Sequence, residues 1–310
     1  MSVLNSLQMN LLEAATAAGF KDRMSYLAPI EQENDFLRVA AWVASTDGKV
    51  NKVTQVAELG SGAWAKVNAP IPEIGSKSET VVETLKIFEG LSSVDTRLLT
   101  GKNKVKVRDA QDIANLEGFI QSFLGGFLYN TETKDGCQGI FSRRGKLSVK
   151  GTVGAGGTAS GSLTSALLVE FGPRGLEMVY EDGEQPGITA TDKGEVFTDG
   201  HYVLQRLYHI EAGIAVHKQL GVQRLCNIDP TKALDVKAFI RMRNQLPSMG
   251  RNAVLFVNRD VKSLIEEACF EKTNATYTYS ELQGYGPVAK VLGIPVMMLE
   301  AIRSDEAVVA

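Results

Sequence analysis

The apolar residues of this chain follow a helical spacing in one long stretch. Between residues 103 and 129 they recur every three or four positions, as Val107, Ala110, Ile113, Leu116, Ile120, Phe123, Leu124, Phe127 and Leu128. This spacing places them on one face of a helix. The pattern therefore predicts a helix about 37 Å long, which would be the longest rigid element of the fold.

Two shorter helices are predicted before this one. The first covers residues 3–18 and stops near Gly19. The second covers residues 29–42, with Pro29 in its first turn and an apolar stripe made by Phe36, Leu37, Ala40 and Ala41. Both are interpreted as arms on a larger body.

A loop rich in glycine and proline separates two β-like runs, which contain Val50, Val53 and Val56 on one side and residues 80–88 on the other. These runs are typical of the two sides of a long hairpin. Prolines at 70 and 72 disfavour helix and central strand in the loop, yet it carries the apolar side chains Trp64, Val67, Ile71 and Ile74. Long structureless loops are uncommon inside compact domains. We therefore expect another copy of the chain to cover these side chains, which favours assembly over catalysis.

The second half of the chain predicts a sheet followed by a separate unit. Residues 163–229 contain strand signals over 166–171, 176–180, 202–209, 214–216 and 222–228, as in an antiparallel sheet. An irregular link over 135–145 and a flexible glycine-rich loop over 151–161 precede it. From residue 231 the pattern becomes helix 231–246, strand 253–257, helix 260–270 and strand 294–299. This order predicts a small α/β unit of its own.

Composition indicates a folded protein without a strong electrostatic preference. The 310 residues are 44% hydrophobic, enough for a sizeable core, and 33 basic against 36 acidic side chains give a formal net charge of -3. This balance disfavours global attraction of nucleic acid. Two local basic clusters are interpreted as solvated loops rather than polyanion sites; they are Lys102, Lys104, Lys106 and Arg108, and Arg143, Arg144, Lys146 and Lys150.

The cysteine count and the chain ends indicate a reducing compartment. Cys137, Cys226 and Cys269 are an odd number at long separations, which fits neither a disulfide framework nor a zinc site. The sequence shows neither a secretory signal nor an apolar run of about 18 residues. We expect a soluble intracellular product that does not associate with a membrane.

The candidate chemical motifs are weak. Residues 154–159 mimic a dinucleotide-binding fingerprint, but a turn and a strand are expected after them instead of the required helix. His201, His209 and His217 are spaced eight apart, which puts them on one face only if the strand register is unbroken, and Gly213 is expected to break it. The carboxylates are scattered. The sequence therefore predicts no catalytic, cofactor-binding or metal-binding residue.

Trp64 and Lys66 share one face if their segment is extended. Two interpretations of Trp64 stay open. Its indole either fills the core of its own subunit or reaches a neighbouring molecule as an aromatic anchor.

Several runs resemble a known family. They are residues 62–68 leading to 90–99, the long helix, 164–173, 203–229, and 252–264 with 292–296. In order and pattern they resemble the major capsid proteins of tailed double-stranded DNA bacteriophages with the Hong Kong 97-type fold, in particular those of short-tailed phages of the epsilon-fifteen kind. The resemblance spans most of residues 50–300.

This resemblance implies an α+β fold and a structural role. Residues 1–48 would be an N-terminal arm, 49–80 an extended β-hairpin loop, 81–230 a peripheral domain with a spine helix over 103–129, and 231–310 an axial domain. The chain would assemble into hexamers and pentamers of an icosahedral shell that encloses double-stranded DNA, held by nonspecific contact. Portal, scaffolding and decoration proteins would be further partners. The product would be part of the virion and would assemble in the bacterial cytoplasm.

The resemblance also points to residues that contact neighbouring subunits. In the extended loop these are Trp64, Lys66, Val67, Asn68 and Ile71. Some relatives cross-link loop lysines to asparagines of a neighbour, and Lys66 lies where such a lysine could sit. The sequence shows no partner constellation for that reaction, so no covalent cross-link is expected.

Two alternatives remain open at this point. The chain could form a nonviral shell of the same fold that encloses cargo enzymes. It could also be an α/β oxidoreductase that binds a dinucleotide at residues 154–159. Purified particles that contain protein cargo instead of DNA would favour the nonviral shell. Binding of a nucleotide would favour the oxidoreductase.

Overall fold

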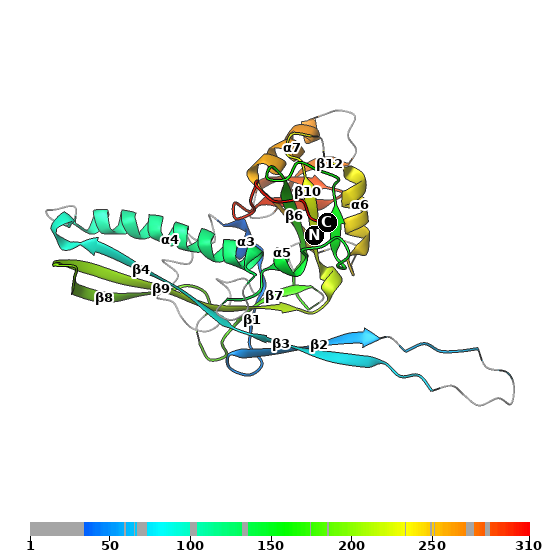
Figure 1. The fold of residues 1–310 in the computed structure, drawn as a ribbon, viewed down its shortest axis with the longest axis horizontal. Coiled ribbons are helices and arrows are strands. Elements are labelled where there is room, and N and C mark those ends of the chain that lie inside the picture. The colour runs from blue at the N-terminus through cyan, green and yellow to red at the C-terminus, as the bar shows by residue number, and fades with distance from the viewer. Residues whose placement is uncertain are drawn as a thin grey trace.

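A computed structural model gives the fold of the chain (Figure 1). It describes residues 34–310 except 59, 65, 67–72, 100–103, 132–135, 174, 185, 233, 249, 251, 271–275 and 283–285. Three parts are visible in Figure 1: a long helix lying along a sheet, a compact α/β unit at one end of that helix, and a two-stranded hairpin that projects beyond the body. The helix predicted over residues 3–18 lies outside the described residues.

The first sheet has five strands. Its order is β1-β7-β9-β4, and β8 also pairs with β9. The strands are β1 Trp42–Ala44, β4 Lys86–Asp95, β7 Leu176–Tyr180, β8 Thr189–Thr198 and β9 His201–Val216, and the 3-10 helix η2 Thr96–Leu98 follows β4. All pairs are antiparallel except β1 with β7. β8 and β9 are joined at Asp199 and Gly200, which both have positive φ, as a two-residue hairpin turn requires.

The predicted long helix is confirmed as α4 Lys104–Tyr129, which packs on this sheet. Its buried face follows the predicted spacing through Phe119, Ile120, Phe123, Leu124, Phe127 and Leu128. The rings of Phe119 and Phe123 lie 4.9 and 5.7 Å from that of Phe88 on β4. Beside them Gly90 allows the close approach, because a Cβ there would lie 2.9 Å from the Phe119 ring.

The second sheet has seven strands in the order β12-β13-β14-β11-β6-β10-β5. The strands are β5 Thr152–Gly154, β6 Thr164–Glu170, β10 Val222–Ile228, β11 Ala253–Val257, β12 Tyr277–Leu282, β13 Gly286–Val291 and β14 Ile294–Met298. Helices α6 Val236–Gln245 and α7 Arg259–Phe270 pack on one face, and the 3-10 helix η3 Gln219–Gly221 precedes β10. Every residue of β6 is buried, with Ala166 and Leu168 in the core under α6 and α7, and Leu167 and Val169 in the core on the opposite face.

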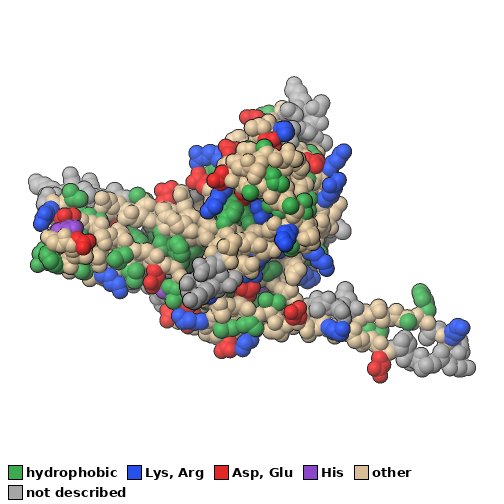
Figure 2. Space-filling view, viewed as in Figure 1, with side chains coloured by type: hydrophobic (Ala, Val, Ile, Leu, Met, Phe, Trp, Pro, Cys, Tyr) green, Lys and Arg blue, Asp and Glu red, His purple; other side chains and the backbone are tan. Residues whose placement is uncertain are grey.

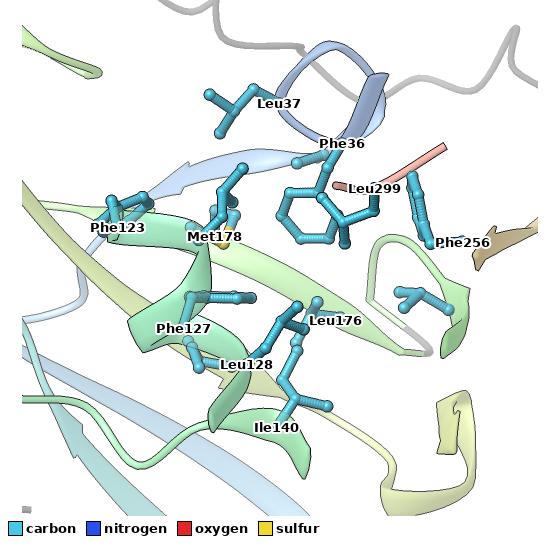
Figure 3. Close-up of a cluster of buried hydrophobic side chains, with 14 of the residues drawn as sticks. Phe36, Leu37, Phe123, Phe127, Leu128, Ile140, Leu176, Met178, Phe256 and Leu299 are labelled. Carbon is cyan, nitrogen blue, oxygen red and sulfur yellow. The ribbon is translucent and has the colours of Figure 1, made fainter. Parts of the chain in front are cut away.

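The core on that opposite face joins the two sheets and α4 (Figure 3). At its centre the Phe36 ring of α3 Asp35–Val39 lies 5.6 Å from Phe127, 5.9 Å from Phe171 and 5.1 Å from Phe256. These partners come from the long helix, the segment after β6 and strand β11. The two sheets and the helix therefore share one continuous apolar core.

Two expectations about the second half of the chain are wrong. Residues 163–229 do not form a single antiparallel sheet, because β6 and β10 belong to the seven-stranded sheet while β7 and β9 belong to the other. For the same reason the strands after residue 231 are not a unit of their own: β11 pairs with β6. Because β6 is apolar on both faces, it fits a central position better than a half-exposed one.

Several element boundaries also differ from the predicted ones. The helix expected over 29–42 is helical in the described residues only at Asp35–Val39, because Ala40 leaves the helical conformation and Trp42 pairs with Met178 in β1. Strand β9 runs through Gly213 without a break. The segment 80–88 is divided at the buried Leu85, so its last residues begin β4. The expected link and loop contain α5 Ile140–Arg143 and β5, and the helix expected from residue 231 begins at Val236.

A buried polar cluster connects α4 to β9 through Arg108, Asp112, Arg206 and Tyr208. Asp112 accepts hydrogen bonds from Arg108 Nε at 3.0 Å and from Arg206 Nη1 at 2.6 Å. The Tyr208 hydroxyl donates to the Asp112 carboxylate at 3.2 Å. Burial, and then the neighbouring Asp112 charge, raise the pKa of Tyr208 to about 12.

We expect this cluster to make folding stability sensitive to alkaline pH. The folded pKa of Tyr208 lies above its ordinary value of 10.0. Its contribution is therefore fully present below about pH 10 and is lost as the pH rises from 10 through 12. Urea unfolding of the wild type and Tyr208→Phe across this range measures the effect. The wild type should lose more stability than the variant, and equal losses would contradict the prediction.

Among the described residues, no helix combines the length and apolar character needed to cross a membrane.

Candidate functional site

The candidate site is the projecting hairpin, formed by β2 Val50–Glu58 and β3 Lys77–Thr84 (Figure 1). The strands pair in antiparallel register from Val50 with Thr84 to Glu58 with Lys77 and form a two-stranded sheet of their own. An isolated two-stranded hairpin is marginally stable in water. The hairpin therefore depends on contacts beyond its own hydrogen bonds.

The two arms stay together past the last paired residues. A Cβ on Gly60 would lie 2.5 Å from Ile74 Cγ2 and 2.8 Å from the Gly75 carbonyl oxygen, so this close approach requires glycine at position 60. Trp64 is fully exposed at 101%, and Ile74 is 64% exposed. Lys66 is exposed as well. Figure 2 shows the hairpin standing clear of the rest of the surface.

These positions exclude one of the two interpretations of Trp64, and its contact with a neighbouring molecule stays a prediction. The indole does not fill the core of its own subunit, because its whole side chain is in contact with solvent. Exposed large apolar side chains that gather on one projecting element are typical of an interaction surface. Val67, Asn68 and Ile71 lie outside the described residues, so their part in this surface stays a prediction.

The base of the hairpin is attached to the five-stranded sheet by a small apolar cluster. Val53 and Leu85 pack there with Val179 and Ala215. The Leu85 amide also donates to the Lys49 carbonyl at 2.9 Å. Four side chains make a small core, so polar contacts must share in fixing the direction of the hairpin.

Two of these polar contacts reach the same sheet. Gln55 Nε2 donates to the Val216 carbonyl at 2.5 Å. Lys49 Nζ lies 3.1 Å from a Glu211 carboxylate oxygen, and this hydrogen bond raises the pKa of the lysine. Gln55 thus reaches the end of β9 that pairs with β7, and Lys49 reaches the part of β9 that pairs with β4.

A third polar contact reaches α5. Arg143 Nη1 and Nη2 donate to the two carboxylate oxygens of Glu83 on β3, at 2.5 and 3.0 Å. Both side chains are 21% exposed. The sequence pattern predicts that Arg143 belongs to a solvated basic loop, and it predicts no role for Glu83. The two residues are 60 positions apart in the chain, so no local sequence pattern indicates that they pair.

Two further exposed aromatic pairs lie far from the hairpin. The rings of Phe197 and Tyr202 meet edge to face beside the β8–β9 turn, with their centres 5.0 Å apart. The two side chains are 61% and 54% exposed. Phe270 of α7 and Tyr279 of β12 lie 6.2 Å apart and are 81% and 45% exposed. Exposed large apolar side chains thus also occur outside the hairpin, and among them Trp64 is the most exposed.

The glycine-rich segment 154–159 has the wrong surroundings for a dinucleotide. It follows β5 and leads to β6, with no helix in the described segment between them. The hollow beside it measures about 90 Å³, against roughly 300–1,000 Å³ for ligand sites. A Cβ on Gly157 would lie 2.6 Å from the Asn227 carbonyl oxygen, so this glycine serves packing within the subunit.

The histidines and cysteines do not form a cluster in the described residues. His209 lies 2.8 Å from Glu89, and His217 lies 2.7 Å from Glu177. Within the part of the chain that the structure describes, no group of three or more His, Cys, Asp or Glu side chains is placed to hold a metal ion. The three cysteines are free thiols.

Comparisons with known proteins give the family. A family model described as major capsid protein GP7 matches residues 27–310. No curated protein matches the sequence. Among solved structures, the fold is similar to that of bacteriophage Epsilon15, with 20% identity, a TM-score of 0.58, and coverage of 87% of this chain and 88% of that chain.

Two other solved structures are more distant. The bacteriophage JBD30 capsid has 12% identity and a TM-score of 0.48, with coverage of 86% of this chain and 90% of that chain. The SrpI encapsulin complex from Synechococcus elongatus PCC 7942 has 13% identity and a TM-score of 0.45, with coverage of 64% of this chain and 88% of that chain. The α+β architecture expected from the sequence is confirmed by the similarity to the Epsilon15 structure.

Proposed function

The chain belongs to the major capsid protein GP7 family, and from this premise we propose that its projecting hairpin joins it to neighbouring subunits of the shell. The chain is a structural subunit of an icosahedral bacteriophage capsid. The proposal adds how one subunit holds the next: the hairpin tip of one copy lies on the body of another. Its apolar side chains, Trp64 foremost, are covered by that contact.

The observation that carries this proposal is the full exposure of Trp64 on an element that leaves the body of its own subunit. An uncovered indole is unfavourable in water, and burial stabilises by about 25 cal/mol per Å² of apolar surface. Ordering costs offset much of that gain in a single contact. A closed shell repeats the contact at every subunit, so modest contacts add up to a stable particle.

The proposal also assigns parts of the chain to places in the shell. The five-stranded sheet with α4 is the peripheral domain, and the seven-stranded sheet with α6 and α7 is the axial domain, which surrounds the five-fold and six-fold axes. The N-terminal arm that the sequence predicts over residues 1–48 is limited in this proposal to residues before 34, because Phe36 lies in the shared core and Trp42 pairs with Met178 in the five-stranded sheet. Support comes from the two separate sheets and from the exposed aromatic pairs at their outer ends.

Further partners follow from the role of the shell. The proposal includes rings of six and five copies, a portal, and scaffolding or decoration proteins. Packaged double-stranded DNA is enclosed by the shell with nonspecific contact alone, because a net charge of -3 gives the chain no global attraction for phosphates. Assembly takes place in the cytoplasm of the bacterial host. The proposal contains no chemical step and no covalent cross-link at Lys66.

Substitution of Trp64 tests the hairpin contact. We expect Trp64→Ala to raise the protein concentration needed for shell formation at least tenfold, because a central aromatic anchor contributes about 2 kcal/mol or more. Light scattering against concentration measures this threshold, and electron microscopy identifies closed particles. The unfolding midpoint of the unassembled subunit should stay unchanged, since the indole has no contact within its own subunit.

Trp64→Phe is the matched control for this experiment. It keeps an aromatic ring and should assemble at close to the wild-type concentration. Assembly of Trp64→Ala at the wild-type threshold would show that Trp64 does not anchor the contact. Electron micrographs of wild-type protein that show no closed particle under any assembly condition would contradict the wider proposal.

A further inference from the structure

Helix α5 lies where three parts of the fold meet. It consists of Ile140–Arg143, and its neighbours on either side are Gly139 and Arg144. Within residues 141–144 this segment contacts the long helix, the seven-stranded sheet and the hairpin.

The first contact fixes α5 to the end of α4. Ser142 Oγ donates to the Tyr129 carbonyl at 2.8 Å, and the rings of Tyr129 and Phe141 meet edge to face at 5.2 Å. A Cβ on Gly139 would lie 2.4 Å from the Leu128 carbonyl oxygen, so the two segments are packed backbone to backbone. α5 therefore follows the end of the long helix as one rigid piece.

The second contact joins α5 to the seven-stranded sheet. Arg224 of β10 donates from Nη1 to the carbonyls of Phe141 and Arg144, at 3.0 and 3.2 Å. Its guanidinium lies 4.6 Å from the centre of the Phe141 ring. Arg224 is buried, so these hydrogen bonds stay out of competition with water.

The third contact joins α5 to the hairpin through Arg143. Its Nε donates to the Gln138 carbonyl at 3.0 Å, which fixes the plane of the guanidinium. Its two outer nitrogens then meet both oxygens of Glu83. A bidentate pair of this kind is directional, because rotation of either group breaks one of the two bonds.

From these three contacts we infer that the Arg143–Glu83 pair sets the direction in which the hairpin leaves the subunit, and that α5 links this direction to the position of the seven-stranded sheet. Arg143 is thus a positioning residue for assembly. The small apolar cluster at the base of the hairpin holds the hairpin in place, and the ion pair selects one angle. This inference rests on the proposed function, because the angle matters only if the hairpin reaches a neighbour.

The mechanism has a simple geometric reason. Glu83 pairs with Asn51 near the base of the hairpin, whereas Trp64 follows Glu58, the last paired residue of β2, so a small rotation at Glu83 becomes a larger displacement at Trp64. Figure 1 shows the paired strands β2 and β3 projecting from the body. A subunit whose hairpin samples several angles presents the correct one for a fraction of the time. Its apparent affinity for a neighbour falls by that fraction.

Charge substitution tests the inference. We expect Glu83→Gln and Arg143→Glu each to raise the concentration needed for shell formation about tenfold, which corresponds to about 1.4 kcal/mol. The exchanged pair, Arg143→Glu with Glu83→Arg, should recover most of the loss. Electron microscopy of the single variants should show open or misshapen particles. The exchanged pair restores the attraction between positions 83 and 143 but not the original side chains. Recovery of assembly would therefore support a positioning role for the ion pair and not a general loss of packing.

Asp192→Asn is the matched control. Asp192 accepts a bidentate pair from Arg206, at 2.7 and 3.0 Å, on the five-stranded sheet away from the hairpin. Its urea unfolding midpoint should move no more than that of Glu83→Gln, because Asp192 is 66% exposed against 21% for Glu83 and Arg206 keeps Asp112 as a partner, and its assembly threshold should stay at the wild-type value.

Two outcomes would overturn the inference. One is assembly of both single variants at the wild-type threshold, and the other is failure of the exchanged pair to recover any of a measured loss. Failure of the proposed function gives a different result, since Trp64→Ala would then assemble normally. Normal assembly of Glu83→Gln together with impaired assembly of Trp64→Ala would reject the positioning role and leave the hairpin contact standing.

Discussion

A subunit whose hairpin is shortened to end at Gly60 and Gly75 is expected to fold with unchanged stability and to lose shell assembly completely. Gly60 and Gly75 lie side by side, so a two-residue Asn-Gly turn can join them without altering β2 or β3. Trp64 and Lys66, which the deletion removes, are exposed and contribute little to the fold of their own subunit. Under the proposed function the deletion removes the whole contact of the tip with a neighbour, so its effect should exceed that of Trp64→Ala.

Sedimentation and electron microscopy would measure assembly, and urea unfolding would measure stability. A second variant keeps the full length but carries serine at Trp64 and Ile74, which separates the apolar side chains from the reach of the loop. It should also fail to assemble. Closed particles from the shortened subunit would contradict a role for the tip, and a lower unfolding midpoint would show that the tip supports its own subunit.

The largest expected loss of stability follows from Arg224→Ala. Arg224 Nη2 lies 2.9 Å from Glu306, and the two side chains are 7% and 5% exposed. Glu306 also accepts hydrogen bonds from the hydroxyls of Tyr129 and Ser165, each at 2.5 Å. Removal of the arginine leaves a buried carboxylate without its cation, which costs about 3–5 kcal/mol. Urea unfolding of the unassembled subunit measures the change.

Two comparison variants sharpen this experiment. Arg303→Ala removes an exposed guanidinium that lies 4.7 Å from the Tyr129 ring, and should cost less than about 1 kcal/mol. Arg224→Met combined with Glu306→Gln removes both charges and should recover a large part of the loss. A cost below 1 kcal/mol for Arg224→Ala, or no recovery in the double variant, would show that the buried charge is not the source of the effect.

Local sequence patterns predicted the elements with strong periodicity and missed those set by distant partners. The long helix is predictable because its apolar spacing repeats over many turns, and its second half buries the resulting face from Phe119 to Leu128, whereas Ile113 of the predicted stripe is 60% exposed. Trp42 was assigned to a helix because its neighbours share helical spacing, yet pairing with Met178 draws it into a strand. Gly213 was expected to interrupt a strand, but β7 on one side and Leu85 nearby hold its backbone extended.

The spacing of apolar residues does not predict the division of the strands into two sheets. β6 and β7 follow one another in the chain with similar composition, and they enter different sheets because of partners far along the sequence. The candidate site shows the same limit. Trp64 could be singled out from its glycine- and proline-rich surroundings, whereas the pair of Arg143 and Glu83 depends on the fold that brings them together.

The central position of β6 has a consequence for how the subunit is made. Both neighbours of β6, β10 and β11, follow it in the chain, and β11 is followed in turn by its other partner β14. During synthesis a strand that is entirely buried in the folded subunit, with apolar Ala166, Leu167, Leu168 and Val169 at its centre, therefore leaves the ribosome with both edges open, and it stays so until much of the remaining chain has emerged. Exposed strands of this kind associate with one another at cellular concentrations. The subunit is therefore most exposed to wrong association during its synthesis, before any shell contact can form.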